Sequence, residues 1–303
     1  STAASIFGIN ASSGVSTYFN NIISLGGSSK TTIYGFYDTG AASQTCNLYF
    51  NTIYSGGTVA SGTNKSYCLY SAAASNTRNY RNNIFSNVRS TTGGSSLHYA
   101  VSLTANTNLT SNYNDYYVSG TGGLLGSMAT IDKSTLALWQ TATAQDANSL
   151  SSIPPFAIAG GSLAANYKPT IGFTSDNTTG VTSDYDLTTR TAAPSMGAYE
   201  VLNVEVWNGT LQAKYTNLKS AFDAINAGTH TGVLEIKIVG STIETAPAVL
   251  KASGSGAASY TSICIYPTTT GLSIANSGNL TELIDLNGAD NVTIDGRVNA
   301  TGS

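Results

Sequence analysis

The chain has 303 residues, of which 41% are hydrophobic and only 10% are charged, and its formal net charge is −3. The hydrophobic content can fill a core, which excludes a disordered chain, and the charged fraction lies well below the roughly 25% of an average soluble protein. The net charge and the lack of a Lys/Arg cluster argue against a nucleic-acid partner. No apolar run approaches the roughly 18 residues of a membrane span, and the three cysteines suggest neither a disulfide framework nor a metal site.

A repeated segment runs through the first 120 residues. It begins as Tyr18-Phe19-Asn20-Asn21-Ile22 and returns at residues 49–55, 80–86 and 112–117. A period near 31 residues is typical of stacked supersecondary units that share one core. Chance recurrence in an Asn-rich chain is the alternative. The asparagines aligned by this comparison are Asn20, Asn51, Asn82 and Asn114.

Alternate positions in each copy share one face, which predicts a strand and not a helix. An asparagine at a fixed turn position can donate to the amide of one neighbouring coil and accept from that of the other. We therefore expect a structural, inward-facing asparagine ladder. The apolar row that accompanies it is expected at Ile22, Ile53, Ile84 and Tyr116.

A second row recurs about once per repeat, always in the order aromatic, small, apolar. Its members are Phe7-Gly8-Ile9, Tyr34-Gly35-Phe36, Tyr67-Cys68-Leu69 and Tyr99-Ala100-Val101. Cys68 occupies the small position, so we interpret it as a strand residue. Two strands per turn of chain predict a parallel β-solenoid with coils about 4.8 Å apart.

The repeats end near residue 131, and the next segment has helical spacing. Residues 133–144 place Leu136, Trp139 and Thr143 on one face, and the expected N-cap is Asp132 or Thr130.

The pattern begins again after residue 201. A strand is expected at residues 204–210 and a helix at residues 215–228, with Thr216 as its N-cap and Gly228 as its stop. Further strands are expected at 233–239, 248–251, 262–266, 272–275, 282–286 and 292–294. The helix has one apolar face, formed by Leu218, Ala221, Phe222 and Ile225.

The run from Thr135 to Leu150, followed by Ile153-Pro154-Pro155-Phe156 and Met196-Gly197-Ala198-Tyr199-Glu200, resembles the closing segment of bacterial right-handed parallel β-helix proteins of the pectate-lyase-like superfamily. It departs from their pattern at Ala144 and Leu187. Residues 218–232 resemble the start of such domains in large surface proteins of Bacteroidetes-type bacteria.

These resemblances imply an all-β, right-handed parallel β-helix with two short capping or junction helices, in an extracellular, cell-surface setting. Residues 1–200 are then expected to be the last coils and end-piece of one β-helix. Residues 201–303 are expected to be the N-terminal cap and first coils of another.

Polysaccharide lyases and glycosidases with this fold need paired carboxylates or Asp-bound calcium beside a basic residue. Asp38 is the only carboxylate in residues 1–110. Two acidic groups remain, and we interpret both as turn residues, although calcium at Asp184 and Asp186 stays open. The groups are Asp176, Asp184 and Asp186 with Arg190, and Asp285, Asp290 and Asp295 with Arg297.

The histidines, His98 and His230, stand alone in the sequence. We therefore expect no catalytic, cofactor-binding or metal-binding residue, no cofactor and no enzyme activity.

The main hypothesis is a non-enzymatic module of a bacterial surface fibre or adhesin. Its expected partners are further copies of itself, stacked head to tail, or adjacent β-helix domains of the same long chain. The alternative is a β-helix that binds or cleaves a polysaccharide, with its tyrosines as stacking platforms for sugars. A third hypothesis, ice binding, lacks the regular Thr-x-Thr row that it requires.

Overall fold

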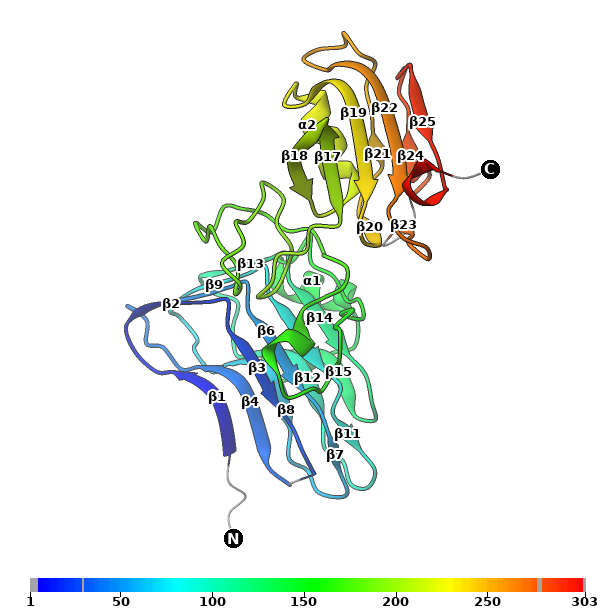
Figure 1. Cartoon of the computed structure of the whole chain (residues 1–303). Helices are drawn as coiled ribbons and strands as arrows, with labels where there is room; N and C mark the ends of the chain where they lie inside the picture. The colour runs from blue at the N-terminus through cyan, green and yellow to red at the C-terminus, as the bar shows by residue number, and fades with distance from the viewer. Residues whose placement is uncertain (1–4, 29, 277–279, 302–303) are drawn as a thin grey trace. The chain divides into compact units, whose positions relative to one another are not determined.

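The computed structural model describes residues 5–28, 30–276 and 280–301 and shows a parallel-stranded β-solenoid with two α-helices (Figure 1). The all-β fold expected from the repeats is confirmed. The chain forms two compact units. The first comprises Ser1–Pro169, Thr178–Thr189 and Met196–Tyr199, and the second comprises Thr170–Asn177, Arg190–Ser195 and Glu200–Ser303. The segments at 170–177 and 190–195, which precede the expected boundary at 200, thus pack with the second unit.

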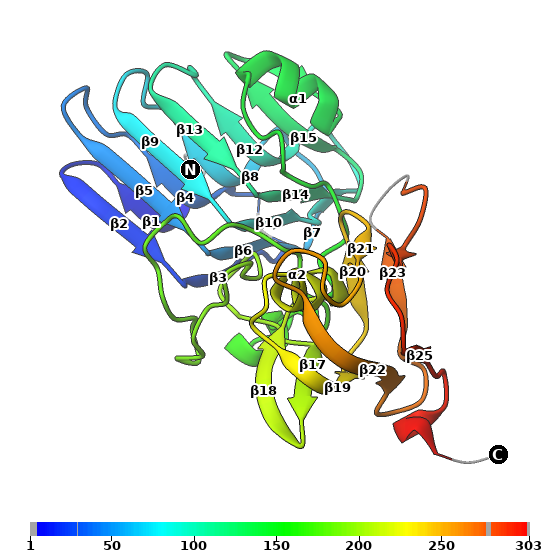
Figure 2. The ribbon, with the colours of Figure 1, turned by 90° about the horizontal axis from the view of Figure 1, so that it is seen from above.

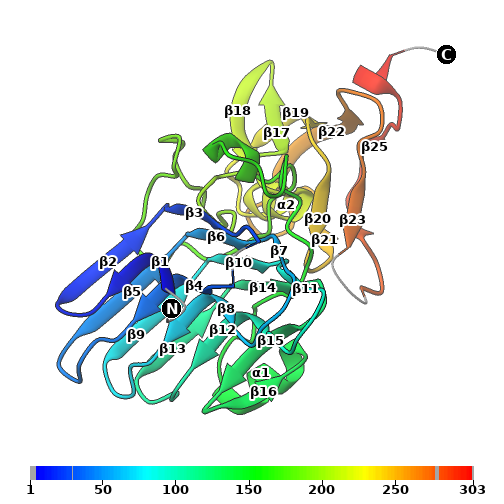
Figure 3. The same cartoon turned by 90° about the horizontal axis from the view of Figure 1, so that it is seen from below.

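The largest sheet of the first unit carries the aromatic, small, apolar row. Its strand order is β1 (Ser5–Ala11), β4 (Thr32–Asp38), β8 (Ser66–Ser71), β12 (His98–Leu103), β15 (Gly123–Met128) and β16 (Ile131–Lys133). The first five strands pair in parallel, one per coil, and β16 closes the sheet by antiparallel pairing with β15. Figures 2 and 3 show these coils side by side.

The other strands of each coil form three smaller parallel sheets. One contains β2 (Val15–Phe19), β5 (Thr45–Tyr49), β9 (Thr77–Arg81) and β13 (Leu109–Asn112), and a second contains β3 (Ile22–Leu25), β6 (Thr52–Ser55), β10 (Ile84–Asn87) and β14 (Asp115–Val118). The third pairs β7 (Thr58–Val59) with β11 (Ser90–Thr91).

The register of the largest sheet confirms the second predicted row. Tyr34 pairs with Tyr67, and Phe36 pairs with Leu69, as expected for coils in register. Cys68 is fully buried at the small position. At the equivalent Gly35, an added Cβ atom would lie 2.3 Å from Cγ2 of Ile53, so the interior has no room for a side chain there.

Helix α1 (Leu136–Thr143) packs against β15 and β16 and buries Trp139 against the aromatic ring of Tyr116. Its N-cap is Thr135, whose side chain accepts a hydrogen bond from the N–H of Leu138. The expected N-cap at Asp132 or Thr130 was wrong, because residues 131–133 extend the sheet as β16 and the helix can begin only after them.

Beyond α1, irregular chain covers the outer face of the β3-β6-β10-β14 sheet. The N–H of Tyr116 donates to the carbonyl of Leu150 at 2.9 Å, and the N–H of Gly197 donates to that of Asn82 at 2.8 Å. The N–H of Ala198 donates to Oγ1 of Thr52 at 3.0 Å. The Gly-Ala-Tyr segment, which resembles a family end-piece, therefore serves as a cover on this sheet. The cover includes the 3₁₀ helix η1 (Ala164–Tyr167).

The second unit has its own core under one five-stranded sheet. The sheet order is β18 (Thr210–Tyr215), β17 (Val204–Asn208), β19 (Thr231–Ile238), β22 (Ser259–Pro267) and β25 (Val292–Ile294). Strands β19, β22 and β25 are parallel, as in a solenoid. Shorter parallel pairs join β20 (Thr242–Glu244) to β23 (Ile274–Asn276) and β21 (Ala248–Val249) to β24 (Ile284–Asp285), and a 3₁₀ helix, η2 (Val298–Ala300), follows β25.

Helix α2 (Leu218–Asn226) packs against this core. Its predicted apolar face is confirmed, since all four side chains are fully buried: Leu218, Ala221, Phe222 and Ile225. The N-cap is Asn217, which accepts from the N–H of Ser220 at 3.0 Å. The expected N-cap, Thr216, instead donates to the carbonyl of Ala193, so this detail was wrong.

Candidate functional site

A continuous ladder of asparagine side chains links four coils of the first unit. The Nδ2 of each residue donates to Oδ1 of the next, at 2.8, 3.0 and 2.9 Å. Each accepting oxygen also receives the backbone N–H of the preceding ladder residue, at 2.9 to 3.0 Å. The three accepting amide oxygens therefore each receive two hydrogen bonds. The ladder residues are Asn21, Asn51, Asn83 and Asn114.

Asn51 and Asn114 were expected in this ladder, but Asn20 and Asn82 were not correctly placed. Both adopt a left-handed backbone, with φ of 55° and 63°, one residue before the ladder. Phe50 and Tyr113 occupy the same turn position in the other two coils, with φ of 54° and 55°. Asparagine tolerates this conformation better than most residues, so the turn and the ladder both select it. The comparison of the repeats by sequence had therefore aligned the turn asparagines of two coils with the ladder asparagines of the other two.

The predicted apolar row is divided by the same one-residue shift. Ile53 and Tyr116 share a row that points into the core, and both pair with Phe85. Ile22 and Ile84 instead pair with Thr52, in the neighbouring row that faces away from the core. Ile84 is nevertheless buried, because the Gly197 segment lies against it.

Asp115 continues that outward row under the same cover. Its Oδ1 accepts from the N–H of Ser152 at 2.8 Å, whereas its Oδ2 has no hydrogen-bond partner among the described residues. Complete burial raises the pKa of this carboxyl to about 8, against the opposing effect of the Ser152 hydrogen bond. Asp115 is therefore protonated at neutral pH.

Two further buried carboxylates of the first unit, Asp38 and Asp146, are structural acceptors. Asp38 accepts from the Tyr80 hydroxyl at 2.7 Å and from the N–H of Gly40 at 2.9 Å. Asp146 accepts from Nε1 of Trp139 at 2.8 Å and from the Ser149 hydroxyl at 2.7 Å. Both are almost fully buried, so neither can reach a substrate.

In the first acidic group, Asp184 and Asp186 have different surroundings. Asp184 is buried and accepts from the N–H of Thr188 at 2.7 Å within a turn, while Asp186 pairs with Lys168 at 3.0 Å on the surface. Within residues 5–28, 30–276 and 280–301, no three His, Cys, Asp or Glu side chains lie together so as to hold a metal ion.

In the second acidic group, Asp295 binds Arg297 through two guanidinium nitrogens, at 3.0 and 2.7 Å. These hydrogen bonds lower the pKa of the Asp295 carboxyl to about 2. Asp290 is exposed, and Asp285 lies on the short strand β24.

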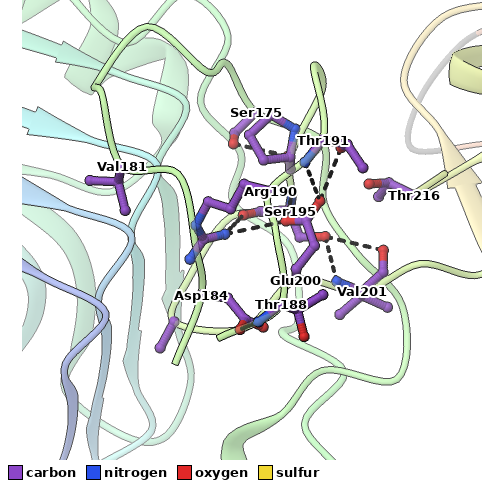
Figure 4. Close-up of polar contacts among 12 residues, drawn as sticks. Ser175, Val181, Asp184, Thr188, Arg190, Thr191, Ser195, Glu200, Val201 and Thr216 are labelled. Carbon is purple, nitrogen blue, oxygen red and sulfur yellow. Dashed lines mark hydrogen bonds and ion pairs between the residues drawn. The ribbon is translucent and has the colours of Figure 1, made fainter. Parts of the chain in front are cut away.

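Arg190, which the sequence groups with Asp184, has a buried partner in the second unit, Glu200 (Figure 4). Their closest nitrogen and oxygen lie 3.3 Å apart. Glu200 also accepts from the N–H of Ser195 at 2.9 Å and from the Thr191 hydroxyl at 3.0 Å. Burial raises the pKa of Glu200, and Ser195, Arg190 and Thr191 oppose that shift. This closed network has the character of a structural clamp, and nothing in the sequence pairs these two residues.

The histidines have structural surroundings. His98 is fully buried, between the hydroxyls of Ser66 and Thr91, both at 2.9 Å. Burial, with a smaller effect of Arg89, lowers the pKa of His98 to about 4. His230 contacts the Tyr215 hydroxyl.

The most distinctive outward-facing feature of the first unit is an aromatic surface on the outer face of its six-stranded sheet, where Phe7 is 40% exposed but Tyr67 and Tyr99 are buried by their neighbours. In one column, successive ring centroids lie 5.0, 5.3 and 5.3 Å apart, with planes within 10° of parallel. In a second column, the rings of Tyr37 and Tyr70 lie 5.4 Å apart. We call this surface the tyrosine face, formed by Phe7, Tyr34, Tyr67 and Tyr99 in the first column and Tyr37 and Tyr70 in the second.

The second column stops abruptly at Tyr70. The next two coils carry Ser102 and Ser127 at the paired positions. A hollow of about 160 Å³ lies there, with Tyr70, Tyr99 and Lys65 among its lining residues. We call it the serine hollow, and it is our candidate functional site. Sequence reasoning noted the tyrosines but missed this hollow, although the change from Tyr at 37 and 70 to Ser at 102 and 127 was its signal.

No helix in the described chain is long and apolar enough to cross a membrane. No protein-family model, curated protein or solved structure matches the chain.

Proposed function

We propose that this chain is a non-enzymatic structural module of an extracellular bacterial surface protein of the pectate-lyase-like superfamily, whose coils stack head to tail with those of another copy. This role is supported by the position of the carboxylates in the coils, which are buried and out of reach of a substrate. Asp38 and Asp115 are the carboxylates of the parallel coil strands that run from β1 to β15, and both are fully buried.

An enzyme that cleaves glycosidic bonds needs two carboxyl groups that reach the substrate together. Asp38 is saturated by side-chain and backbone donors, and Asp115 lies under the chain that covers its sheet. On the exposed strand β16, Asp132 accepts from the Tyr99 hydroxyl at 2.9 Å. This arrangement favours a structural module over the polysaccharide-cleaving alternative.

The stacking part of the proposal rests on exposed apolar side chains at sheet edges. In the first unit, β1, β2 and β3 stand at the edges of their sheets, where Val15 is 76% exposed and Phe19 is 50% exposed. In the second unit, β25 is an edge strand, on which Ile294 is 53% exposed. Open strand edges are templates for pairing. Joining the two different edges of successive copies gives a contact that does not close and so builds a filament.

Electron microscopy and sedimentation of the purified chain test this proposal. Unbranched filaments that grow with concentration are expected, with an axial repeat of a few nanometres, since coils are about 4.8 Å apart. The double variant Val15→Lys, Phe19→Lys is expected to remain monomeric. The matched control is Ile158→Lys, because Ile158 is 59% exposed but lies outside the edge strands. Compact monomers of the unmodified chain at every concentration would refute stacking.

The non-enzymatic part is tested separately, with a panel of neutral and acidic polysaccharides. No reducing ends and no unsaturated products are expected. Product release that disappears in Asp132→Asn or Asp184→Asn would establish the enzymatic alternative.

A further inference from the structure

We propose that the serine hollow binds one sugar ring of a neutral glycan, which lies on the face of Tyr70 as the next member of its column. This inference goes beyond the structural role proposed above, because it gives the coils a ligand. It rests on the interrupted column, on two hydroxyl groups without partners and on the balance of charge around the rim.

The interrupted column provides a free aromatic face. Tyr70 has Tyr37 on one side, at 5.4 Å between ring centroids, but only Ser102 on the other. Each coil adds one strand spacing of about 4.8 Å, so the two serine coils leave room for a ring in stacking contact. The flat apolar face of a pyranose suits such a surface, as the faces of aromatic side chains do.

The floor of the hollow provides hydrogen-bonding groups. Ser102 and Ser127 are each only 7% exposed, and neither hydroxyl has a hydrogen bond to a described residue. Neither Oγ is among the buried side-chain atoms that lack a partner, so both are open to the hollow and can hydrogen-bond to water or to a ligand there. Sugar hydroxyls both donate and accept, as serine hydroxyls do. An aromatic side chain of a peptide would fill the space but leave both hydroxyls unsatisfied.

The rim favours an uncharged ligand. Lys65 is exposed, with Nζ 5.7 Å from the centroid of the Tyr99 ring, and Asp132 accepts from the hydroxyl of that same tyrosine. These opposite charges lie beside the same ring, so Lys65 would attract a polyanion and Asp132 would repel it. Thr104 and Thr130 add neutral hydroxyls to the lining.

The size of the hollow limits what it can hold. Its volume of about 160 Å³ lies below the roughly 300 to 1,000 Å³ of pockets that enclose drug-sized ligands. It therefore suits a single ring of a chain that continues along the exposed sheet, and affinity is expected to come from a glycan with several contacts and not from a free monosaccharide.

The most direct test fills the hollow with tyrosine, the residue that occupies this position in the two preceding coils. Calorimetric titration with a panel of neutral oligosaccharides of glucose, mannose, galactose and N-acetylglucosamine is expected to reveal binding to the unmodified chain. Ser102→Tyr continues the column and is expected to weaken that binding by about tenfold or more while the chain remains folded. Tyr70→Ala is expected to have a similar effect.

Tyr37→Ala is the matched control, because it removes a ring of the same column on the side away from the hollow, and binding is expected to persist. The filament assay is expected to be unchanged in Ser102→Tyr, which separates this inference from the structural role. Three outcomes would overturn it: no neutral oligosaccharide binds, Ser102→Tyr binds as well as the unmodified chain, or only an acidic glycan or an aromatic peptide binds.

Discussion

One buried carboxyl is expected to make the stability of the first unit depend on pH. Asp115 has a pKa of about 8 in the folded chain, whereas an unfolded aspartate has a pKa of about 3.9. Between these values the folded chain holds a proton that the unfolded chain releases. The free energy of unfolding therefore falls as the pH rises from about 4 to about 8, and the loss is complete above that range.

The magnitude follows from the difference of about four pKa units. At about 1.4 kcal/mol per unit, ionisation of the buried group costs about 6 kcal/mol. This figure is an upper bound, because the chain around Ser152 can open and admit water to the carboxylate. A loss of several kcal/mol is a large fraction of the stability of a typical domain.

The perturbation that isolates this effect is Asp115→Asn. The amide keeps the shape and the oxygen that accepts from Ser152, but it cannot ionise. In urea unfolding at about pH 4, the variant and the unmodified chain are expected to differ by less than ~1 kcal/mol, whereas at about pH 9 the variant is expected to be more stable by several kcal/mol.

Asp186→Asn is the control, since Asp186 pairs with Lys168 on the surface and its substitution should leave the slope above about pH 5 unchanged. Parallel pH profiles of the unmodified chain and Asp115→Asn would refute the reasoning.

Three further predictions concern stability. Asn51→Leu is expected to cost about 1 to 3 kcal/mol in urea unfolding, because it removes the side-chain hydrogen bonds to Asn21 and Asn83 in the two neighbouring coils; an unchanged midpoint would contradict the ladder's role. Gly35→Ala is expected to cost about 1 to 3 kcal/mol through its clash with Ile53, and Gly296→Ala, at an open position that also has no positive φ, measures the effect of the backbone alone. Glu200→Gln is expected to lower the stability of the second unit by about 1.5 to 3 kcal/mol, because it replaces the carboxylate that accepts from Arg190, Ser195 and Thr191 with a neutral amide; equal unfolding of the two proteins near neutral pH would count against the clamp.

The sequence predicted the solenoid because its repeat is visible in two rows at once. The row through Tyr34 and Tyr67 could be placed in register, because every coil in this row has the same three types of residue in the same order: aromatic, small and apolar. The row through Asn20 and Asn51 could not. There, a left-handed turn residue and a ladder residue are adjacent and both favour asparagine, and Phe50 shows that the turn position tolerates other residues.

The candidate site was only partly predictable. Ser102 follows Tyr99 as Tyr70 follows Tyr67, so the row placed in register already indicated one missing ring, but β15 lies outside the recognised row and only the strand register places Ser127 beside Ser102. The pKa of Asp115 likewise depends on a cover that comes from residues far along the chain, such as Ser152. Patterns within a repeat predict what coils share, whereas these two features arise where one coil differs from its neighbours or meets a distant segment.

The asparagine ladder also gives the first unit a direction. Each amide-to-amide hydrogen bond donates toward the coil of higher number, so these links share one direction along the stack. Asn51, Asn83 and Asn114 also donate to a backbone carbonyl of the preceding coil. The last donor, Asn114, lies 3.3 Å from a carboxylate oxygen of Asp146. Aligned amides polarise one another, and the negative charge sits at the end where the N–H groups point. At the opposite end, no described residue donates to Oδ1 of Asn21. Because each link repeats the same donor and acceptor, a whole coil could be inserted or removed between two others without reversing the chain of dipoles, whereas a coil of opposite polarity would break it.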